Sequence, residues 1–173
     1  ISIYLSAFLI FVTGCTIQPV QYTFVGTAMG TVISQNVYTK GDDITKNIMD
    51  IITSLQQDRL SYRIAESEVG IINAQAGKGY SLALSKELNN DLIICMDVWA
   101  KSEGAFDITV GPVTKLWKID AWAAGKNTDL EIPRPDQIES VLAQTGFDKV
   151  RFDEGNILLL EGMSLDLGAV GKG

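Results

Sequence analysis

Apolar residues recur every three or four positions in three stretches of the chain. The clearest repeat begins after Ser85, a residue type that can cap a helix, and ends near Gly104. Acidic residues precede a second repeat, which predicts a helix over 43–60, and a third predicts a helix over 136–145. The apolar positions of the first of these helices are Leu88, Leu92, Cys95, Met96 and Trp99, and of these Cys95 is expected to be a small buried hydrophobe.

Shorter runs rich in β-branched and aromatic residues predict strands. Residues 22–25 and 31–38 flank glycines and small residues, so they are expected to be two strands joined by a turn. Residues 149–152 and 156–160 flank an Asp-Glu-Gly-Asn sequence and predict a hairpin. Between these regions, Gly111-Pro112 reads as a turn that leads into a short apolar stretch.

The alternation of hairpins and helices predicts an α+β fold. A chain of 173 residues can bury a core of its own, and no repeat or linker divides residues 20–173. The net charge of −7 repels phosphate backbones and therefore argues against nucleic-acid binding. The sequence has no histidine, which excludes Ser-His pairs, Cys-His pairs and histidine metal sites, whereas cation sites built from oxygen ligands stay open.

The first fourteen residues are apolar and uncharged. This stretch is shorter than the roughly 20 residues of a transmembrane helix, so we interpret 1–14 as a signal peptide. It ends in Val-Thr-Gly before Cys15, which resembles the lipobox of bacterial lipoproteins. We expect lipidation of Cys15, a tether over 15–25, and attachment to a membrane surface of the cell envelope, facing the periplasm or the cell exterior. A buried strand that happens to end in Gly-Cys is the alternative. Because Ile1 is not a methionine, we expect the natural chain to start upstream.

Four segments have the composition of binding loops. Residues 26–31 place two glycines between strands, which suits either a turn or close approach to a flat ligand. Residues 60–73 are polar and follow a helix, and a solvated loop is the alternative. In 104–112, Asp107 stands between apolar residues and would be costly to bury unpaired, so it either binds a polar partner or caps a turn. Residues 166–173 combine an acid, glycines and a lysine and could bind phosphate.

Taken in this order, the four segments resemble the ApbE family of FAD:protein FMN transferases. The most specific of them is GAFDITVGPVTKLW, and with GTAMGT, LSYR and DLGAVGKG the resemblance spans nearly all of 26–173. It implies that 26–173 is the N-terminal part of a T-fold-related mixed sheet with helices. It also implies Mg²⁺-dependent transfer of FMN from FAD to a threonine or serine of a redox protein, with release of AMP. An FAD-hydrolysing relative and a flavin-storing lipoprotein are the alternatives. A plain solute-binding or structural lipoprotein that shares only the export signal is a third, and the GAFDITVGP block argues against it.

The resemblance also assigns residues. Met29 would pack against the flavin, Ala169 would offer its carbonyl to Mg²⁺, and no catalytic residue is assigned. The remaining FAD-binding positions are Ala105, Phe106, Asp107, Asp166 and Lys172.

The sequence departs from the family pattern in two ways. The aromatic residue that the family places two positions after its serine falls at Arg63, with Tyr62 one position early. The aspartate and threonine that complete the family's Mg²⁺ site have no match in these 173 residues. Since Mg²⁺ needs near-octahedral oxygen coordination, we expect the 173 residues alone to be a poor catalyst.

Overall fold

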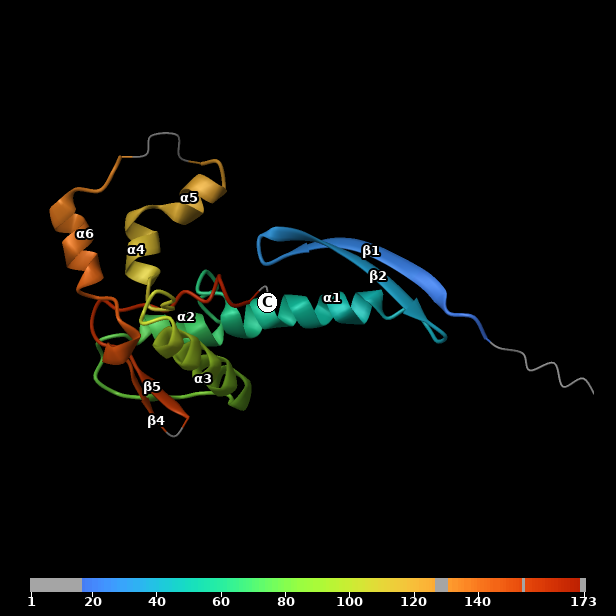
Figure 1. Cartoon of the computed structure of the whole chain (residues 1–173), viewed down its shortest axis with the longest axis horizontal. Coiled ribbons are helices and arrows are strands. Elements are labelled where there is room, and N and C mark those ends of the chain that lie inside the picture. Colours follow the sequence, from blue (N-terminus) through green and yellow to red (C-terminus); the bar gives the residue numbers. More distant parts are fainter. Residues whose placement is uncertain (1–16, 127–130, 154, 172–173) are drawn as a thin grey trace, which may run out of the picture.

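The computed structural model describes residues 17–126, 131–153 and 155–171. It has an elongated arm, made of β1, β2 and α1, and a body that holds the remaining elements (Figure 1). In the arm, β1 (Val20–Ala28) pairs antiparallel with β2 (Thr31–Thr39), and α1 (Thr45–Ser54) runs along one face of the hairpin. The two strands and the helix that were expected here are confirmed, and the helix continues as a π-helical turn over Leu55–Leu60.

Side chains of the hairpin alternate between α1 and solvent, as the pleat of a strand requires. Phe24 and Val37 face inward and are half-buried, whereas Val25 and Tyr38 are each 66% exposed. The acidic start expected for this helix is wrong in detail, because the N-cap is Ile44, without a side-chain cap hydrogen bond, and the first turn holds no acid. Asp43 stands one residue earlier, where its Oδ1 accepts a hydrogen bond from the Thr45 amide at 2.9 Å. The arm therefore stays together by packing on one side of the hairpin only.

The body is built around a single hydrophobic core. Its longest helix, α3 (Lys86–Lys101), is capped by Ser85, whose Oγ accepts a hydrogen bond from the Leu88 amide at 3.1 Å, as predicted. Next to it lie α2 (Glu68–Ala74) and a sheet with the order β3-β5-β4. The buried core residues are Val69, Ile72, Leu88, Leu92, Cys95, Ile108, Phe147, Ile157, Leu159, Met163, Leu165 and Leu167.

The sheet of the body is small and antiparallel. Its strands are β3 (Leu82–Ala83), β4 (Arg151–Asp153) and β5 (Asn156–Leu158), and the last two form the predicted hairpin. A 3₁₀ turn over Phe147–Lys149 leads into β4. Every strand pair among the described residues is antiparallel, and with the helices this confirms the α+β class.

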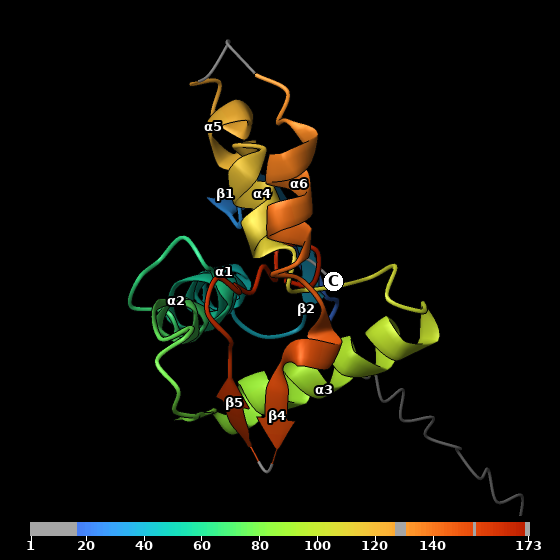
Figure 2. The same cartoon turned by 90° about the vertical axis from the view of Figure 1, so that its left-hand side faces the viewer.

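Three short helices form a lobe on top of the body: α4 (Gly111–Leu116), α5 (Ile119–Ala123) and α6 (Pro135–Leu142) (Figure 2). The helix over 136–145 is confirmed as α6, although it ends earlier. The turn expected at Gly111-Pro112 is wrong, since these residues begin α4. Proline is favoured in the first turn of a helix because its missing N–H has no partner there anyway. No helix among the described residues is long and apolar enough to cross a membrane.

Candidate functional site

The segment after α3 and the segment after β5 lie side by side. The Asp166 amide donates a hydrogen bond of 2.7 Å to the Ile108 carbonyl. Farther along, Gly111 faces Ser164 so closely that a Cβ at Gly111 would lie 2.2 Å from the Ser164 Oγ and 2.7 Å from the Ser164 carbonyl oxygen. Only glycine fits at that position without displacing its neighbour. The structure thus brings together the third and fourth segments that the sequence singled out.

The second segment joins them through α2. Asn73 Nδ2 donates to the Leu165 carbonyl at 2.9 Å, and the Leu165 amide donates to Asn73 Oδ1 at 2.7 Å. Ser67 is fully buried and caps α2: its Oγ accepts from the Gly70 amide at 2.9 Å and donates to the Ser61 carbonyl at 2.6 Å. The solvated-loop alternative for this segment is therefore wrong. The sequence analysis did not predict this helix, although a serine followed by a glutamate before apolar residues is a pattern that could have indicated its start.

Asp107 fixes a turn with both of its carboxylate oxygens. Oδ1 accepts from the amide and the hydroxyl of Thr109, at 2.7 and 2.6 Å, and Oδ2 accepts from the Phe147 amide at 3.1 Å. The Thr109 hydroxyl oxygen in turn accepts from the Gly146 amide at 2.7 Å. Of the two roles left open by the sequence, the structure shows the turn. The same hydrogen bonds hold the start of the 3₁₀ turn against the segment after α3.

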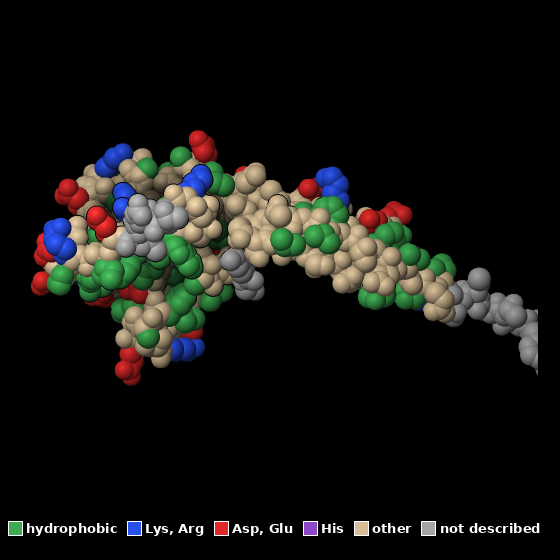
Figure 3. Space-filling view, turned by 90° about the horizontal axis from the view of Figure 1, so that it is seen from above, with side chains coloured by type: hydrophobic (Ala, Val, Ile, Leu, Met, Phe, Trp, Pro, Cys, Tyr) green, Lys and Arg blue, Asp and Glu red, His purple; other side chains and the backbone are tan. Residues whose placement is uncertain are grey.

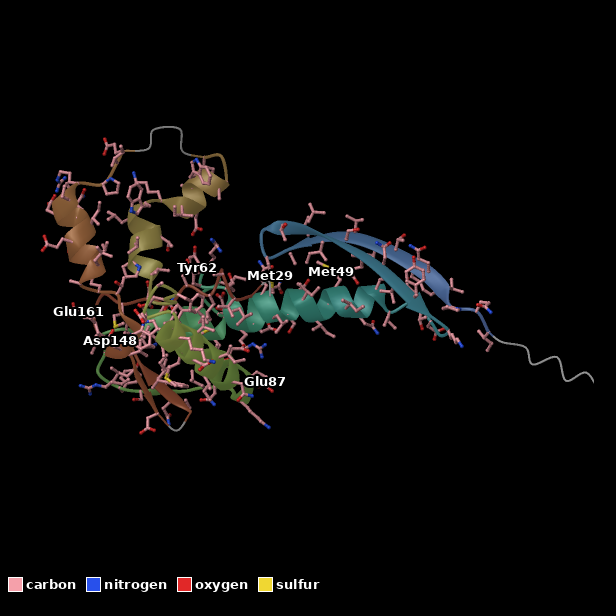
Figure 4. The ribbon with its side chains drawn as sticks, viewed as in Figure 1. Met29, Met49, Tyr62, Glu87, Asp148 and Glu161 are labelled. Carbon is pink, nitrogen blue, oxygen red and sulfur yellow. The ribbon has the colours of Figure 1, made fainter. Side chains whose placement is uncertain are left out.

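Met29 lies at the end of the hairpin that faces the body (Figure 4). Its amide donates to Gln56 Oε1 at 2.6 Å, and Gln56 is held by the π-helical turn. Met29 and Gly30 both have positive φ, of 51° and 69°, as in the tight two-residue turns of β-hairpins. A Cβ at Gly171 would lie 3.8 Å from the Met29 Sδ, so the hairpin turn reaches the fourth segment, residues 166–173, which we call the glycine-rich loop. The first and fourth segments are therefore also neighbours.

The glycine-rich loop is held by its own first residues. Asp166 Oδ1 accepts from the Gly168 amide at 2.8 Å, and the amides of Val170 and Gly171 donate to the Leu167 carbonyl at 2.9 and 3.0 Å. Ala169 is exposed within this loop.

The other predicted positions are spread around this loop. Ala105 is exposed, whereas Phe106 packs on the edge of the core. Lys172 and Cys15 lie outside the described residues.

An open cleft of about 1020 Å³ lies between α2, α4 and α6. Residues 162–165, Tyr62 and Arg63 are among those that line it. The volume is at the upper end of the range for small-molecule sites. None of the six described residues to which the resemblance gave a role lines this cleft. They belong to adjoining segments: Met29, Ala105, Phe106, Asp107, Asp166 and Ala169.

Three side chains form a polar cluster beside the cleft. The Tyr62 hydroxyl donates to both carboxylate oxygens of Asp120, at 2.8 and 3.0 Å, and Arg63 Nε donates to the same carboxylate at 2.8 Å. The Arg63 guanidinium also lies 4.3 Å from the centre of the Tyr62 ring. Sequence reasoning missed Asp120, because nothing in its local pattern distinguishes it from an ordinary surface acid and its partners lie far away in the sequence.

Electrostatics tie this cluster to the glycine-rich loop. Burial, the hydrogen bond to Asp120 and the nearby Asp166 carboxylate raise the pKa of the Tyr62 hydroxyl above its usual range. Burial acts to raise the pKa of Asp120, but the hydrogen bonds from Arg63 and Tyr62 outweigh it and the pKa is lowered. Tyr62 is thus a neutral donor and Asp120 an anion at physiological pH.

The described residues contain no group of three or more histidine, cysteine, aspartate or glutamate side chains that could hold a metal ion. Within the glycine-rich loop, the exposed Ala169 can offer a carbonyl oxygen.

Comparison with known sequences gives a consistent picture. A sequence model of the ApbE family matches residues 29–173. The FAD:protein FMN transferase of Klebsiella pneumoniae (strain 342) is 30% identical over 156 residues, which cover 88% of this chain and 46% of that protein. The protein of the same name from Treponema pallidum (strain Nichols) is 29% identical over 165 residues, or 88% of this chain and 44% of that protein.

Solved structures show the same fold. The ApbE protein of Thermotoga maritima has a TM-score of 0.75 and 25% identity, over 88% of this chain and 49% of that one. The flavin transferase ApbE of Vibrio cholerae has a TM-score of 0.76 over 89% of this chain and 50% of that one, with 21% identity, and this likeness concerns the fold alone. The chain spans about half the length of the relatives that it matches.

Proposed function

We infer, from the premise that this chain belongs to the ApbE family, that the complete protein is an FAD:protein FMN transferase to which these residues contribute the flavin site. In this reaction a threonine or serine hydroxyl of a redox protein loses its proton and its oxygen attacks the FMN phosphorus. The pyrophosphate bond breaks, and AMP leaves with the bridging oxygen. The observation that carries this proposal is the family match over 29–173, supported by two curated relatives that bear this name.

The proposal assigns FAD contacts to the segments around the glycine-rich loop. Met29 suits a flavin contact because its turn is fixed by Gln56 and reaches Gly171. A polarizable thioether packs well on an aromatic ring system. Tyr62 and Arg63 lie beside the cleft as a stacked pair, which can take the place of the aromatic residue that the family pattern puts at position 63. The other assigned contacts are Ala105, Phe106, Asp107, Asp166 and Lys172.

An anionic substrate in a chain of net charge −7 needs local positive partners. Backbone amides of a glycine-rich loop and the Lys172 ammonium group can supply them. Mg²⁺ would neutralise charge on the pyrophosphate when bound, and we assign one ligand to this chain, the Ala169 carbonyl. The rest of the role of these residues is to bind and orient FAD.

The test uses the complete protein with FAD, Mg²⁺ and a threonine-containing redox acceptor. Covalent flavin on the acceptor, read by in-gel fluorescence, together with release of one AMP per transfer, is the expected result. Formation of free FMN and AMP with no labelled acceptor would show that the protein hydrolyses FAD and does not transfer FMN. Bound FAD with neither product would make the protein a flavin-storage protein.

The flavin site itself is tested through Asp107. We expect Asp107→Ala to weaken FAD binding by about 1–3 kcal/mol, because it removes a polar partner and releases the turn next to the site. Asp136→Ala is the matched control, since Asp136 is exposed and pairs with Arg134 in the lobe. The measurement is a fluorescence titration of the flavin. Unchanged affinity for FAD in a folded Asp107→Ala variant would show that Asp107 only fixes the turn and does not contribute to FAD binding.

We further propose that Cys15 is lipidated and holds the protein at a membrane surface of the cell envelope. The support is the apolar run of residues 1–14 that ends in the lipobox-like sequence before Cys15. Metabolic labelling with a fatty acid in a bacterial host should tag the wild-type protein and not Cys15→Ser. Equal labelling of both would show that the lipid is attached elsewhere, and labelling of neither would show that the protein carries none.

A further inference from the structure

The π-helical turn over Leu55–Leu60 lies where the arm joins the body. It follows α1 of the arm and precedes α2 of the body in the chain. In Figure 3 the arm leaves the body as a narrow extension, and Figure 4 shows Met29 at the end of the hairpin that faces the body. Contacts made by the π-helical turn therefore decide where the tip of the hairpin lies relative to the body.

The tip of the hairpin places a methionine where the backbone does not favour one. Ala28 pairs with Thr31, so Met29 and Gly30 form a two-residue turn in which Met29 has a φ of 51°. Such turns favour Asn-Gly, because positive φ is costly for most other residues. The Met29 amide also lies outside the ladder between the two strands and needs an acceptor elsewhere. A methionine at this position is therefore stable only with support from another element.

Gln56 supplies this support. Its Oε1 accepts a hydrogen bond from the Met29 amide at 2.6 Å, although the two residues are 27 positions apart. The backbone of Gln56 is held as well, because the Ser61 amide donates to the Gln56 carbonyl at 3.2 Å, across five residues as in a π-helix. Turns of this kind are rare and occur frequently at functional sites.

The other end of the π-helical turn reaches the glycine-rich loop. Leu60 packs on the edge of the core, and a Cβ at Gly171 would lie 3.4 Å from the Leu60 Cδ1 and 3.8 Å from the Met29 Sδ. Tyr62, which lines the cleft, follows two residues after Leu60. One short element thus holds the hairpin turn at its first end and touches the glycine-rich loop at its last.

We propose that Gln56 is a positioning residue for the flavin, which holds the Met29 turn in the conformation that presents the thioether to FAD. The proposal rests on the proposed function, in which Met29 is a flavin contact, and adds a residue that acts only through Met29. Without the acceptor on Gln56, the turn can relax toward the negative φ that methionine prefers. The Met29 side chain then leaves the glycine-rich loop, and FAD loses a contact that is formed in advance of binding.

The test is a double-mutant cycle on the complete protein, with the Kd for FAD as the readout. Gln56→Leu removes the acceptor, and we expect the Kd to rise about fivefold to tenfold, the size of one lost hydrogen bond. Because Gln56 acts through the Met29 side chain, Met29→Ala combined with Gln56→Leu should bind FAD no more weakly than Met29→Ala alone. Gln56→Glu keeps an acceptor oxygen at the same reach and should restore most of the binding. Gln57→Leu is the matched control, since Gln57 is the exposed neighbour in the same turn, and it should leave the Kd unchanged.

A merely structural role for Gln56 would give different results. If Gln56→Leu weakens FAD binding equally with and without the Met29 side chain, Gln56 does not act through Met29 and the proposal is wrong. Equal Kd values for Gln56→Leu and Gln57→Leu would overturn it as well. If Gln56→Leu does not fold, Gln56→Asn, whose acceptor is one methylene shorter, takes its place in the cycle with the same expectations. Absence of FAD binding by the folded wild-type protein would instead reject the proposed function and, with it, this role of Gln56.

Discussion

Replacing Gly111 by alanine tests how tightly the segment after α3 packs against the segment after β5. The new Cβ would lie 2.2 Å from the Ser164 Oγ, which can rotate away, and 2.7 Å from the Ser164 carbonyl oxygen, which cannot. Ordinary contact begins near 3.4 Å, so the two segments must separate by about 0.7 Å. That shift strains the nearby hydrogen bond from Asp166 to Ile108, which measures 2.7 Å.

The expected cost follows from two opposing effects. Overpacking of a dense site costs about 1–3 kcal/mol or more, whereas alanine in place of glycine in a helix gains up to about 1 kcal/mol. Because Gly111 is the first residue of α4, where propensity counts least, we expect packing to win and Gly111→Ala to lose about 1–3 kcal/mol of unfolding free energy. Urea unfolding of the complete protein, followed by tryptophan fluorescence, measures it.

Two variants complete this experiment. Gly41→Ala is the matched control, since a Cβ there would meet only the Thr39 Oγ1 at 3.6 Å, and we expect a change within about 0.5 kcal/mol. Adding Ser164→Ala to Gly111→Ala should recover only part of the loss, because the carbonyl contact persists. If Gly111→Ala is as stable as Gly41→Ala, the two segments are not tightly packed and the reasoning fails.

Three further variants probe the arm, the cluster and the core. Gln35 is buried and its Oε1 has no hydrogen-bond partner among the described residues, so Gln35→Met should be neutral or raise the melting temperature; a loss above about 1 kcal/mol would show a missed partner. The pKa of Asp120 is lower in the folded protein than its ordinary value near 4. Ionised Asp120 therefore stabilises the fold at pH values above that ordinary pKa, and this stabilisation disappears as the pH falls through the folded-state pKa. The stability difference between wild type and Asp120→Asn should therefore be constant from about pH 6 to 8 and shrink as the pH falls below about 4, and a difference that does not change with pH would contradict this. Burial and the nearby Asp91 raise the pKa of Cys95 to about 11, so in a Cys15→Ser background a thiol reagent should react with it at pH 8 only after denaturant is added; rapid reaction in the native state would contradict its burial.

Periodic elements were predictable from the sequence because their signals are local. The helix after Ser85 has both a capping residue and an apolar stripe, and each appears in the structure. The two hairpins have glycines at their turns, which few other residues could replace at positive φ. In contrast, α5 is five residues long with no apolar repeat, so no periodic signal can identify it.

The site was predictable as segments and not as contacts. Motifs identified four stretches. The structure joins them through contacts such as the hydrogen bond from Asn73 to the Leu165 carbonyl and the one from the Asp166 amide to the Ile108 carbonyl. The role of Asp120 depends on partners 57 and 58 residues away, and such pairings leave no mark in the local sequence. The turn role of Asp107 was an open alternative, since a carboxylate two residues before a threonine favours such a turn and a ligand contact alike.

The bond between Asn73 and Leu165 also has a consequence for the order in which the molecule forms. These residues are 92 positions apart, and the core likewise includes residues from Val69 to Leu167. The arm, in contrast, contains a hairpin closed by two residues and a helix that follows directly. Since distant pairings form more slowly than local ones, the arm can form while the chain is still being made. The body has to wait for residues 163–167, and until then α2 has no partner for its Asn73 amide.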